Sequence, residues 1–297
     1  MPFKSGFIAI IGRPNAGKST LLNSIIGEKI SIVSKKPQTT RNVIRGVKNL
    51  KDGDGQVVFI DTPGLHRARG LLNEFMVGAA LRAIRDTDGI VYLVEATRDI
   101  GDDERFIMEN LRGLKCPVIL AINKIDLVDK RSLLPLMERY SGLFPFKEIV
   151  PVSALKGDGA GLLVEVISRI LPEGPRYFPE DIITDQPERF IASEIIREKV
   201  FILTKEEIPY STAVVVEEFK EREEKNLVYI SAVINVERDS QKAIIIGKRG
   251  AMLKDIGASA RADIEKLLGV RVYLELFVKV KKGWTGDSRA MKEFGYE

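Results

Sequence analysis

The 297-residue sequence is short of several residue types, and each shortage excludes a class of protein. A single cysteine, Cys116, rules out an internal disulfide framework and suits a reducing compartment such as the cytosol. No apolar run approaches the roughly 20 residues that a membrane-spanning helix needs. The N-terminus has one lysine before a strand-like run, a pattern that does not predict a signal peptide. We therefore expect a cytoplasmic protein, and the length predicts about two domains.

A glycine-rich loop near the N-terminus carries the strongest functional signal. It follows a short apolar run and opens an amphipathic run, which predicts a strand, a tight turn and a helix. Gly12 and Gly17 let backbone N–H groups face an anion, and the helix dipole favours negative charge at the same place. Lys18 can reach the β- and γ-phosphates of a nucleotide, and the Ser19 hydroxyl can hold Mg²⁺. A plain turn with a solvated lysine is the alternative. The predicted phosphate-binding residues are Gly12, Arg13, Pro14, Asn15, Ala16, Gly17, Lys18, Ser19 and Thr20.

The first part of the chain, residues 1–171, alternates strand-like and helix-like patterns. Such alternation predicts an α/β domain with a mostly parallel six-stranded sheet and helices on both faces. Ligands of such sheets bind at the carboxyl ends of the strands. The predicted strands are 6–11, 42–48, 56–60, 89–94, 117–122 and 148–152, and the predicted helices are 18–26, 71–85, 102–111, 131–140 and 161–171.

A second polar motif follows the strand at 56–60. Asp61 stands at the strand end, where a carboxylate can hold Mg²⁺ through water. Gly64 offers a backbone N–H that can approach a γ-phosphate. An ordinary turn is the alternative interpretation, which the preceding phosphate loop makes the weaker one. The segment contributes Asp61, Thr62, Pro63, Gly64 and Leu65 to the predicted site.

Two further segments predict the base that the site accepts. Asp126, at the end of Asn123-Lys124-Ile125-Asp126, can accept hydrogen bonds from N1–H and the 2-amino group of guanine. Adenine would leave this carboxylate unpaired, so such a site discriminates by about 10⁴-fold. Helix capping by Asn or Asp is the alternative. The loop after the last strand adds Ser153, Ala154 and Leu155 as base-contacting residues, so the base-site residues are Asn123, Lys124, Asp126, Ser153, Ala154 and Leu155.

These motifs, in this order, resemble the GTP-binding domain of the translation-factor-related GTPases, and Gln38-Thr39-Thr40-Arg41 resembles the first switch loop of their Era branch. The resemblance implies that Thr40 closes onto Mg²⁺ and the γ-phosphate, so that Ser19, Thr40 and Asp61 form the metal site. It also implies that Ala154 offers its N–H to guanine. Two solvated loop hydroxyls at 39–40 are the alternative.

The sequence lacks the water-orienting glutamine that Ras-like enzymes carry after this glycine. Leu65 stands there, and His66, the single histidine, follows it. A solvated loop histidine is the preferred interpretation, with a catalytic base as the alternative. The resemblance suggests instead that Asn15 helps to hold K⁺ beside the phosphates. We expect slow turnover of GTP to GDP and phosphate, with Lys18, Asn15, Thr40 and Gly64 as catalytic residues.

A proline-rich segment at residues 172–186 predicts a semi-rigid linker to a second domain at 187–284. The element order there is helix, strand, strand, helix, helix, strand. Trp284 is predicted to cover the edge of the core, with base stacking as the alternative. No structure is predicted for the tail at 285–297. The helices are expected at 187–203, 241–246 and 251–268, and the strands at 211–219, 227–236 and 270–280, with a charged turn at 220–226.

A short basic loop separates the last two predicted helices. It reads Gly247-Lys248-Arg249-Gly250, and with the element order it resembles a bacterial type II KH domain, an α+β fold. The net charge of the chain is only +4, but residues 242–282 hold ten Lys or Arg against four acids. A merely solvated basic face is the alternative. The predicted RNA-binding residues are Gly247, Lys248, Arg249, Gly250 and Lys254.

Together the motifs cover nearly the whole chain and identify it as a member of the Era family. The resemblance implies a GTP-driven switch that binds the 3′ end of 16S ribosomal RNA and assists assembly of the 30S subunit. It implies Mg²⁺ and GTP or GDP as ligands, K⁺ as a further cation, and a monomer. Peripheral association with the membrane surface stays open. The other classes kept open are a P-loop ATPase or kinase of a small molecule, and a constitutive RNA-binding protein with a structural nucleotide site.

Overall fold

The computed structural model describes residues 2–34, 36–68, 70–205, 208–222 and 226–296. Backbone contacts divide the chain into two units. The first comprises Met1–Ser31, Thr40–Arg69 and Met76–Asp185, and the second Ile32–Thr39, Gly70–Phe75 and Gln186–Glu297. Among the described helices, none has the length and apolar character needed to cross a membrane.

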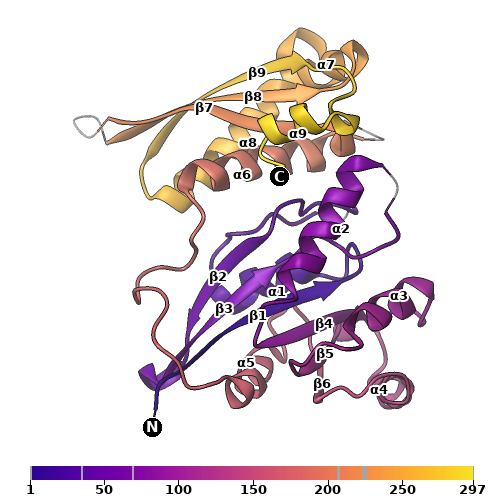
Figure 1. Ribbon diagram of the computed structural model, residues 1–297. Coiled ribbons are helices and arrows are strands. Elements are labelled where there is room, and N and C mark those ends of the chain that lie inside the picture. Colours follow the sequence, from indigo (N-terminus) through magenta and orange to yellow (C-terminus); the bar gives the residue numbers. More distant parts are fainter. Residues whose placement is uncertain (1, 35, 69, 206–207, 223–225, 297) are drawn as a thin grey trace. The chain divides into compact units, whose positions relative to one another are not determined.

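The first unit is built on a six-stranded sheet with the order β2-β3-β1-β4-β5-β6 (Figure 1). β2 is antiparallel to β3, and the other neighbouring pairs are parallel. Strands β3, β4 and β5 are buried along their whole length, which explains their unbroken apolar sequences. The strands are β1 Lys4–Gly12, β2 Ile44–Asn49, β3 Gly55–Asp61, β4 Gly89–Glu95, β5 Val118–Asn123 and β6 Glu148–Pro151.

Helices cover both faces of this sheet, as predicted. Apolar side chains of α2, α3 and α4 share one core with β1, β4 and β5. The predicted helix at 131–140 begins later, at Leu133, because Lys130–Ser132 forms a separate 3₁₀ turn, in which the side chain of Asp129 accepts from the N–H of Arg131. The helices are α1 Lys18–Ile26, α2 Leu71–Ala83, α3 Asp102–Leu111, α4 Leu133–Ser141 and α5 Ala160–Ile170.

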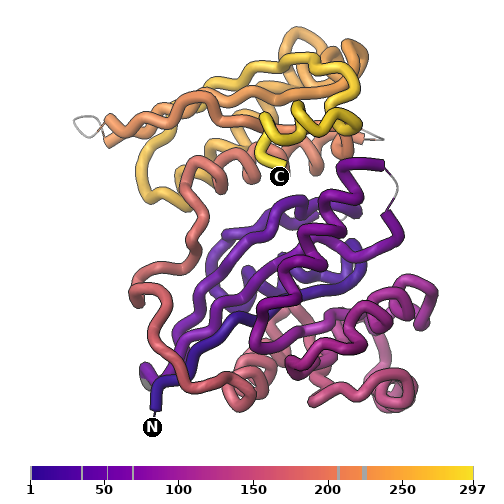
Figure 2. Tube along the Cα trace, viewed as in Figure 1, coloured from indigo at the N-terminus to yellow at the C-terminus, as the bar shows by residue number. Residues whose placement is uncertain are grey.

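The second unit has the predicted order of elements around a three-stranded sheet, β7-β8-β9. β7 and β8 are antiparallel, and β8 and β9 are parallel. Figure 2 follows the backbone from α6 through these strands to the last helix. Residues 223–225 of the predicted charged turn lie outside the described residues. The elements are α6 Glu188–Leu203, β7 Ala213–Arg222, β8 Leu227–Val236, α7 Asp239–Ile246, α8 Ala251–Leu268, β9 Arg271–Val280 and α9 Ser288–Glu293.

Trp284 is fully buried in the second unit, so the interpretation as a core residue is confirmed. Its indole N–H donates to the carbonyl of Ser211 at 2.8 Å, and its ring stacks on Tyr296 with centroids 5.7 Å apart. The tail, for which the sequence predicted nothing, forms α9 and returns Tyr296 to this ring. A buried ring is not available to stack on a base.

Residues 32–34 and 36–39 belong to the second unit, and several of them contact α6. The N–H of Val33 donates to Glu198 Oε1 at 2.9 Å, and Lys36 Nζ donates to two carbonyl groups near the end of α6. Arg197 Nη2 donates to the carbonyl of Thr39 at 2.6 Å, while the same guanidinium forms two bonds to Glu194. Of the segment that resembles a switch loop, residues 38–41, Thr39 is thus held by α6, and residues just before the segment are held by the same helix.

Candidate nucleotide-binding site

The phosphate loop joins β1 to α1 and can be built only with glycine at two positions. Gly12 has φ 155° and Gly17 has φ 99°, both in the region that side chains disfavour. A Cβ at Gly12 would lie 2.3 Å from the carbonyl oxygen of Leu93, and one at Gly17 would lie 2.2 Å from Asn123 Nδ2. The loop is thus pressed against the ends of β4 and β5, which places it at the carboxyl edge of the sheet.

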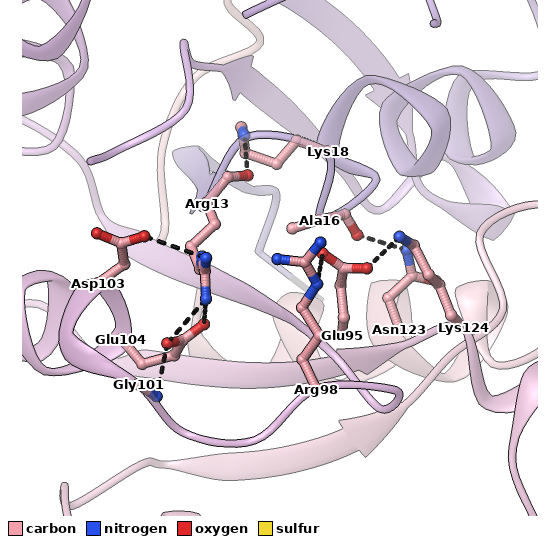
Figure 3. Close-up of polar contacts among 10 residues, drawn as sticks. All are labelled: Arg13, Ala16, Lys18, Glu95, Arg98, Gly101, Asp103, Glu104, Asn123 and Lys124. Atoms are coloured by element: carbon pink, nitrogen blue, oxygen red, sulfur yellow. Dashed lines mark hydrogen bonds and ion pairs between the residues drawn. The ribbon is translucent and has the colours of Figure 1, made fainter. Parts of the chain in front are cut away.

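Lys18 is buried beneath this loop, where it holds the backbone in place. Its Nζ donates to the carbonyl oxygen of Gly12 at 3.2 Å. It also donates to the carbonyl oxygen of Arg13 at 3.0 Å (Figure 3). Burial lowers the pKa of Lys18 to about 8, against the opposing attraction of Asp61 and Glu95. Burial thus disfavours the protonated form of this amine. An anion bound nearby would stabilise the protonated form, so the site favours a negatively charged ligand.

The side chain of Arg13 faces away from the loop and toward α3. It forms ion pairs with Glu104 at 2.9 Å and Asp103 at 3.1 Å (Figure 3). Glu104 also accepts from the N–H of Gly101, so the start of α3 is fastened to the loop. Of the predicted phosphate-binding residues, Arg13 can therefore contribute only its backbone.

All three predicted metal-site residues meet beside the loop. Ser19 Oγ donates to Asp61 Oδ2 at 2.6 Å and lies 2.8 Å from Thr40 Oγ1. Burial raises the pKa of Asp61, whereas Lys18 and the hydroxyl group of Ser19 oppose that rise. Hydroxyl and carboxylate oxygens are the ligands that Mg²⁺ prefers, so the donor set fits this ion.

The segment after Asp61 packs tightly against the phosphate loop. Thr62 Oγ1 donates to the carbonyl of Ile10 at 2.9 Å, and a Cβ at Gly64 would lie 2.6 Å from the backbone nitrogen of Pro14. Leu65 is fully buried and its N–H donates to the carbonyl of Gly12 at 3.0 Å. The residue at the position of the Ras-like glutamine is thus part of the core, and its side chain is not available to orient a water molecule.

Asn123 connects the phosphate loop with the predicted base loop. Its Nδ2 donates to the carbonyl of Ala16 at 2.8 Å, and its Oδ1 accepts from the N–H of Ala154 at 2.9 Å. The N–H that was expected to meet guanine is directed at Asn123 in this structure. A guanine contact from Ala154 therefore requires that hydrogen bond to be shared or released.

Asp126 is held in an ionised state at the base end of the site. Ser153 Oγ donates to Asp126 Oδ1 at 2.7 Å, and this bond lowers the pKa of the carboxyl group. Lys124 pairs with Glu95, which also lies 3.5 Å from Arg98 (Figure 3). No motif pointed to Glu95, although it ends the buried strand β4, where an acidic residue is unusual and could have served as the signal.

The basic loop of the second unit is open to solvent. Gly247 has φ 71°, and a Cβ there would lie 2.7 Å from the Cβ of Met252, so a glycine is required. Lys248, Arg249 and Lys254 are exposed, and none of them forms an ion pair with a residue that the structure describes. The loop and the first turn of α8 therefore present three positive charges near the junction of α7 and α8.

Comparison with known proteins agrees with both units. A family model described as a 50S ribosome-binding GTPase matches residues 7–124, and a KH domain model matches residues 207–285. GTPase Era of Geobacter metallireducens is 59% identical over 295 residues, which cover 99% of this chain and 98% of the relative. The chain belongs to the Era family of GTPases. GTPase Era of Syntrophus aciditrophicus is 54% identical over 294 residues, covering 99% and 95% of the two chains.

Two solved Era structures have the same fold over 99% of both chains at 43% identity. A single-residue variant of Era from Aquifex aeolicus, bound to GDP·AlF₄⁻, gives a TM-score of 0.95. Era in complex with MgGDPNP and nucleotides 1506–1542 of 16S ribosomal RNA gives a TM-score of 0.96. These matches confirm the predicted fold class, the GTPase activity and the membership of the Era family.

Proposed function

We propose that this Era-family GTPase binds GTP with Mg²⁺, reads the 3′ end of 16S ribosomal RNA through its KH domain, and assists assembly of the 30S subunit. The observation that carries the proposal is the convergence of Lys18, the Ser19–Thr40–Asp61 cluster and Asp126 at one edge of the sheet. Era in complex with MgGDPNP and a 16S RNA fragment supports both halves of it.

In the first unit, one set of residues would bind the phosphates and another would hold the metal ion. The loop N–H groups and Lys18 would bind the β- and γ-phosphates, while Ser19, Thr40 and Asp61 would hold Mg²⁺. The ion, when bound, supplies charge that offsets the negative charge of the phosphates. Gly64 allows the backbone to come close to the γ-phosphate, since a side chain there would collide with Pro14.

Water activation needs another device than a glutamine, because Leu65 is buried. We propose that Asn15, which has φ 67° in the loop, helps to hold K⁺ beside the phosphates. Turnover without a partner is then slow. GTP hydrolysis measured in KCl and in NaCl tests this point, and equal rates in the two salts contradict it.

Guanine selection is assigned to Asp126, whose ionised carboxylate can accept from N1–H and the 2-amino group. A competition assay of GTP against ATP tests it, and equal affinities would favour a small-molecule ATPase or kinase. The proposed nucleotide-binding residues are 12–20 of the phosphate loop, Asp61, Thr62, Pro63, Gly64 and Leu65, and Asn123, Lys124, Asp126, Ser153, Ala154 and Leu155.

RNA recognition is assigned to the open loop Gly247–Gly250 together with Lys254, in a KH domain at 187–284 that a linker at 172–186 joins to the GTPase domain at 1–171. The nucleotide state can control RNA binding only if both ligands prefer the same arrangement of the chain. The segment that resembles a switch loop, residues 38–41, supports such coupling, because its Thr39 belongs to the second unit whereas its Thr40 hydrogen-bonds to Ser19 in the first.

Binding of the RNA 3′ end, measured with GDPNP and with GDP, tests this coupling. We expect tighter binding with GDPNP, and equal affinities would favour a constitutive RNA-binding protein with a structural nucleotide site. We further propose that the protein acts as a cytoplasmic monomer. Sedimentation of the purified chain tests whether it is a monomer. Its distribution between cytosol and membrane fractions tests its location, and a peripheral pool would appear in the membrane fraction.

A further inference from the structure

Ser31 is a buried residue on the metal side of the site that no sequence motif includes. It is 1% exposed, and its Oγ donates to Asp61 Oδ2 at 2.8 Å. Ser19 Oγ donates to the same oxygen at 2.6 Å. Two hydroxyl groups thus hold one carboxylate oxygen, while Asp61 Oδ1 is buried and has no hydrogen-bond partner among the described residues.

The position of Ser31 is set by Asn23 of α1. Asn23 Oδ1 accepts from the N–H groups of Ile30 at 3.1 Å and Ser31 at 3.0 Å, and its Nδ2 donates to the carbonyl of Ser31 at 2.7 Å. Both ends of the side-chain amide are engaged, so Asn23 cannot rotate without losing these bonds. The helix that carries Ser19 in its first turn therefore also fixes the hydroxyl group of Ser31.

A buried carboxylate oxygen without a donor is costly unless a ligand satisfies it. Mg²⁺ in proteins usually keeps several of its waters, which are donors. With Ser19 as its only partner, the Asp61 carboxylate could turn about its Cβ–Cγ bond and exchange its two oxygens. With Ser31 in place, Oδ2 is held from two sides and Oδ1 stays the open oxygen.

We propose that Ser31, held by Asn23, is a positioning residue that orients the Asp61 carboxylate for Mg²⁺. Oδ2 remains fixed by the two serine hydroxyl groups, and Oδ1 would accept a hydrogen bond from water bound to the metal. The inference rests on the proposed function, because it requires Mg²⁺ to accompany the nucleotide at this site. It adds a residue outside all the recognised motifs to the machinery of the metal site.

The test measures the affinity of the full chain for fluorescently labelled GDP as Mg²⁺ is titrated, and again in EDTA. In Ser31→Ala we expect the Mg²⁺ concentration that gives half of the gain in GDP affinity to rise about tenfold, which is the lower end of the loss in metal affinity when a hydrogen bond to a metal ligand is removed. The affinity in EDTA stays within about twofold, since Ser31 acts through Asp61. Ser24→Ala, which removes a half-buried hydroxyl group from α1, is the matched control and behaves as the native chain.

Other outcomes overturn the inference in distinct ways. An unchanged Mg²⁺ requirement in Ser31→Ala contradicts it, and an equal loss of affinity in EDTA shows a merely structural role. In an Asp61→Ala background the Ser31→Ala change should have no further effect on the Mg²⁺ requirement, and a full shift there also contradicts it. If the native chain shows no Mg²⁺ dependence at all, the proposed metal site itself fails, which separates the two claims.

Discussion

The two glycine-rich basic loops of this molecule differ in whether the cations that they offer to an anion are buried or exposed. In the phosphate loop the cation, Lys18, is buried and already bonded to two carbonyl groups. In the loop of the second unit the cations, Lys248 and Arg249, are exposed. A pre-formed buried site fits one ligand geometry, whereas exposed charges track a flexible phosphate backbone and are screened by salt. Burial of the cation is thus what distinguishes the proposed nucleotide site from the proposed RNA surface.

The largest effect is expected where the buried cation is removed. Lys18→Ala should lower the rate of GTP hydrolysis by about 10²–10³-fold, because its charge meets the transferring phosphoryl group. A malachite-green phosphate assay measures the rate, and circular dichroism verifies the fold. Lys248→Ala is the matched control and should hydrolyse GTP at the native rate. A similar loss in both variants would remove the distinction between the loops.

Substitution of a glycine by alanine should destabilise the protein more in the phosphate loop than in the basic loop of the second unit. Gly17→Ala brings a Cβ to 2.2 Å from Asn123, whereas Gly250→Ala meets nothing within 4 Å and bears only the strain of φ 79°. We expect free energies of unfolding lowered by about 3 kcal/mol for Gly17→Ala and about 1 kcal/mol for Gly250→Ala. Urea unfolding followed by circular dichroism measures both. Equal losses would mean that the phosphate loop is no more tightly packed than its counterpart.

Removal of the exposed cations should affect RNA and leave the nucleotide alone. Lys248→Ala combined with Arg249→Ala should weaken binding of a 16S 3′-end oligonucleotide by about tenfold, and the salt dependence of log K should lose about 1.4 units of slope. Filter binding at several KCl concentrations measures both quantities. An unchanged slope would show that these side chains do not meet phosphates. GDP affinity, measured in parallel, should stay at the native value.

The smallest effect follows from the lowered pKa of Lys18. Phosphates stabilise the protonated amine, so GDP affinity should fall about fourfold from pH 7 to 8.5, as expected for a group with a pKa of about 8. In the nucleotide-free chain the unfolded state binds more protons between pH 8 and 10.5, so this group makes stability rise with pH there. Calorimetry in two buffers detects proton uptake on binding, and its absence at pH 8 contradicts the burial argument.

The sequence was sufficient to predict which residues gather at one edge of the sheet wherever those residues belong to short motifs. Lys18, Ser19 and Asp61 belong to short motifs at strand ends, and the alternation of elements placed those motifs at one edge of the sheet. The contacts of Ser31 with Asp61 and of Arg197 with Thr39 were not predictable, because they join segments that are distant in sequence. Neither residue differs in type from many serines and arginines elsewhere.

The hydrogen bond from Arg197 to the carbonyl of Thr39 limits how the backbone around Thr39 can move. Arg197 is 1% exposed, and its Nη1 has no hydrogen-bond partner among the described residues. If the carbonyl of Thr39 departs, a further buried N–H loses its acceptor, which costs about 1–3 kcal/mol. Intermediate positions of the backbone around Thr39 lose the hydrogen bond while Arg197 stays buried, so no bond to water offsets the cost. Residues 36–39 should therefore be either docked or fully released, and their departure should occur as an all-or-none step, not as gradual loosening.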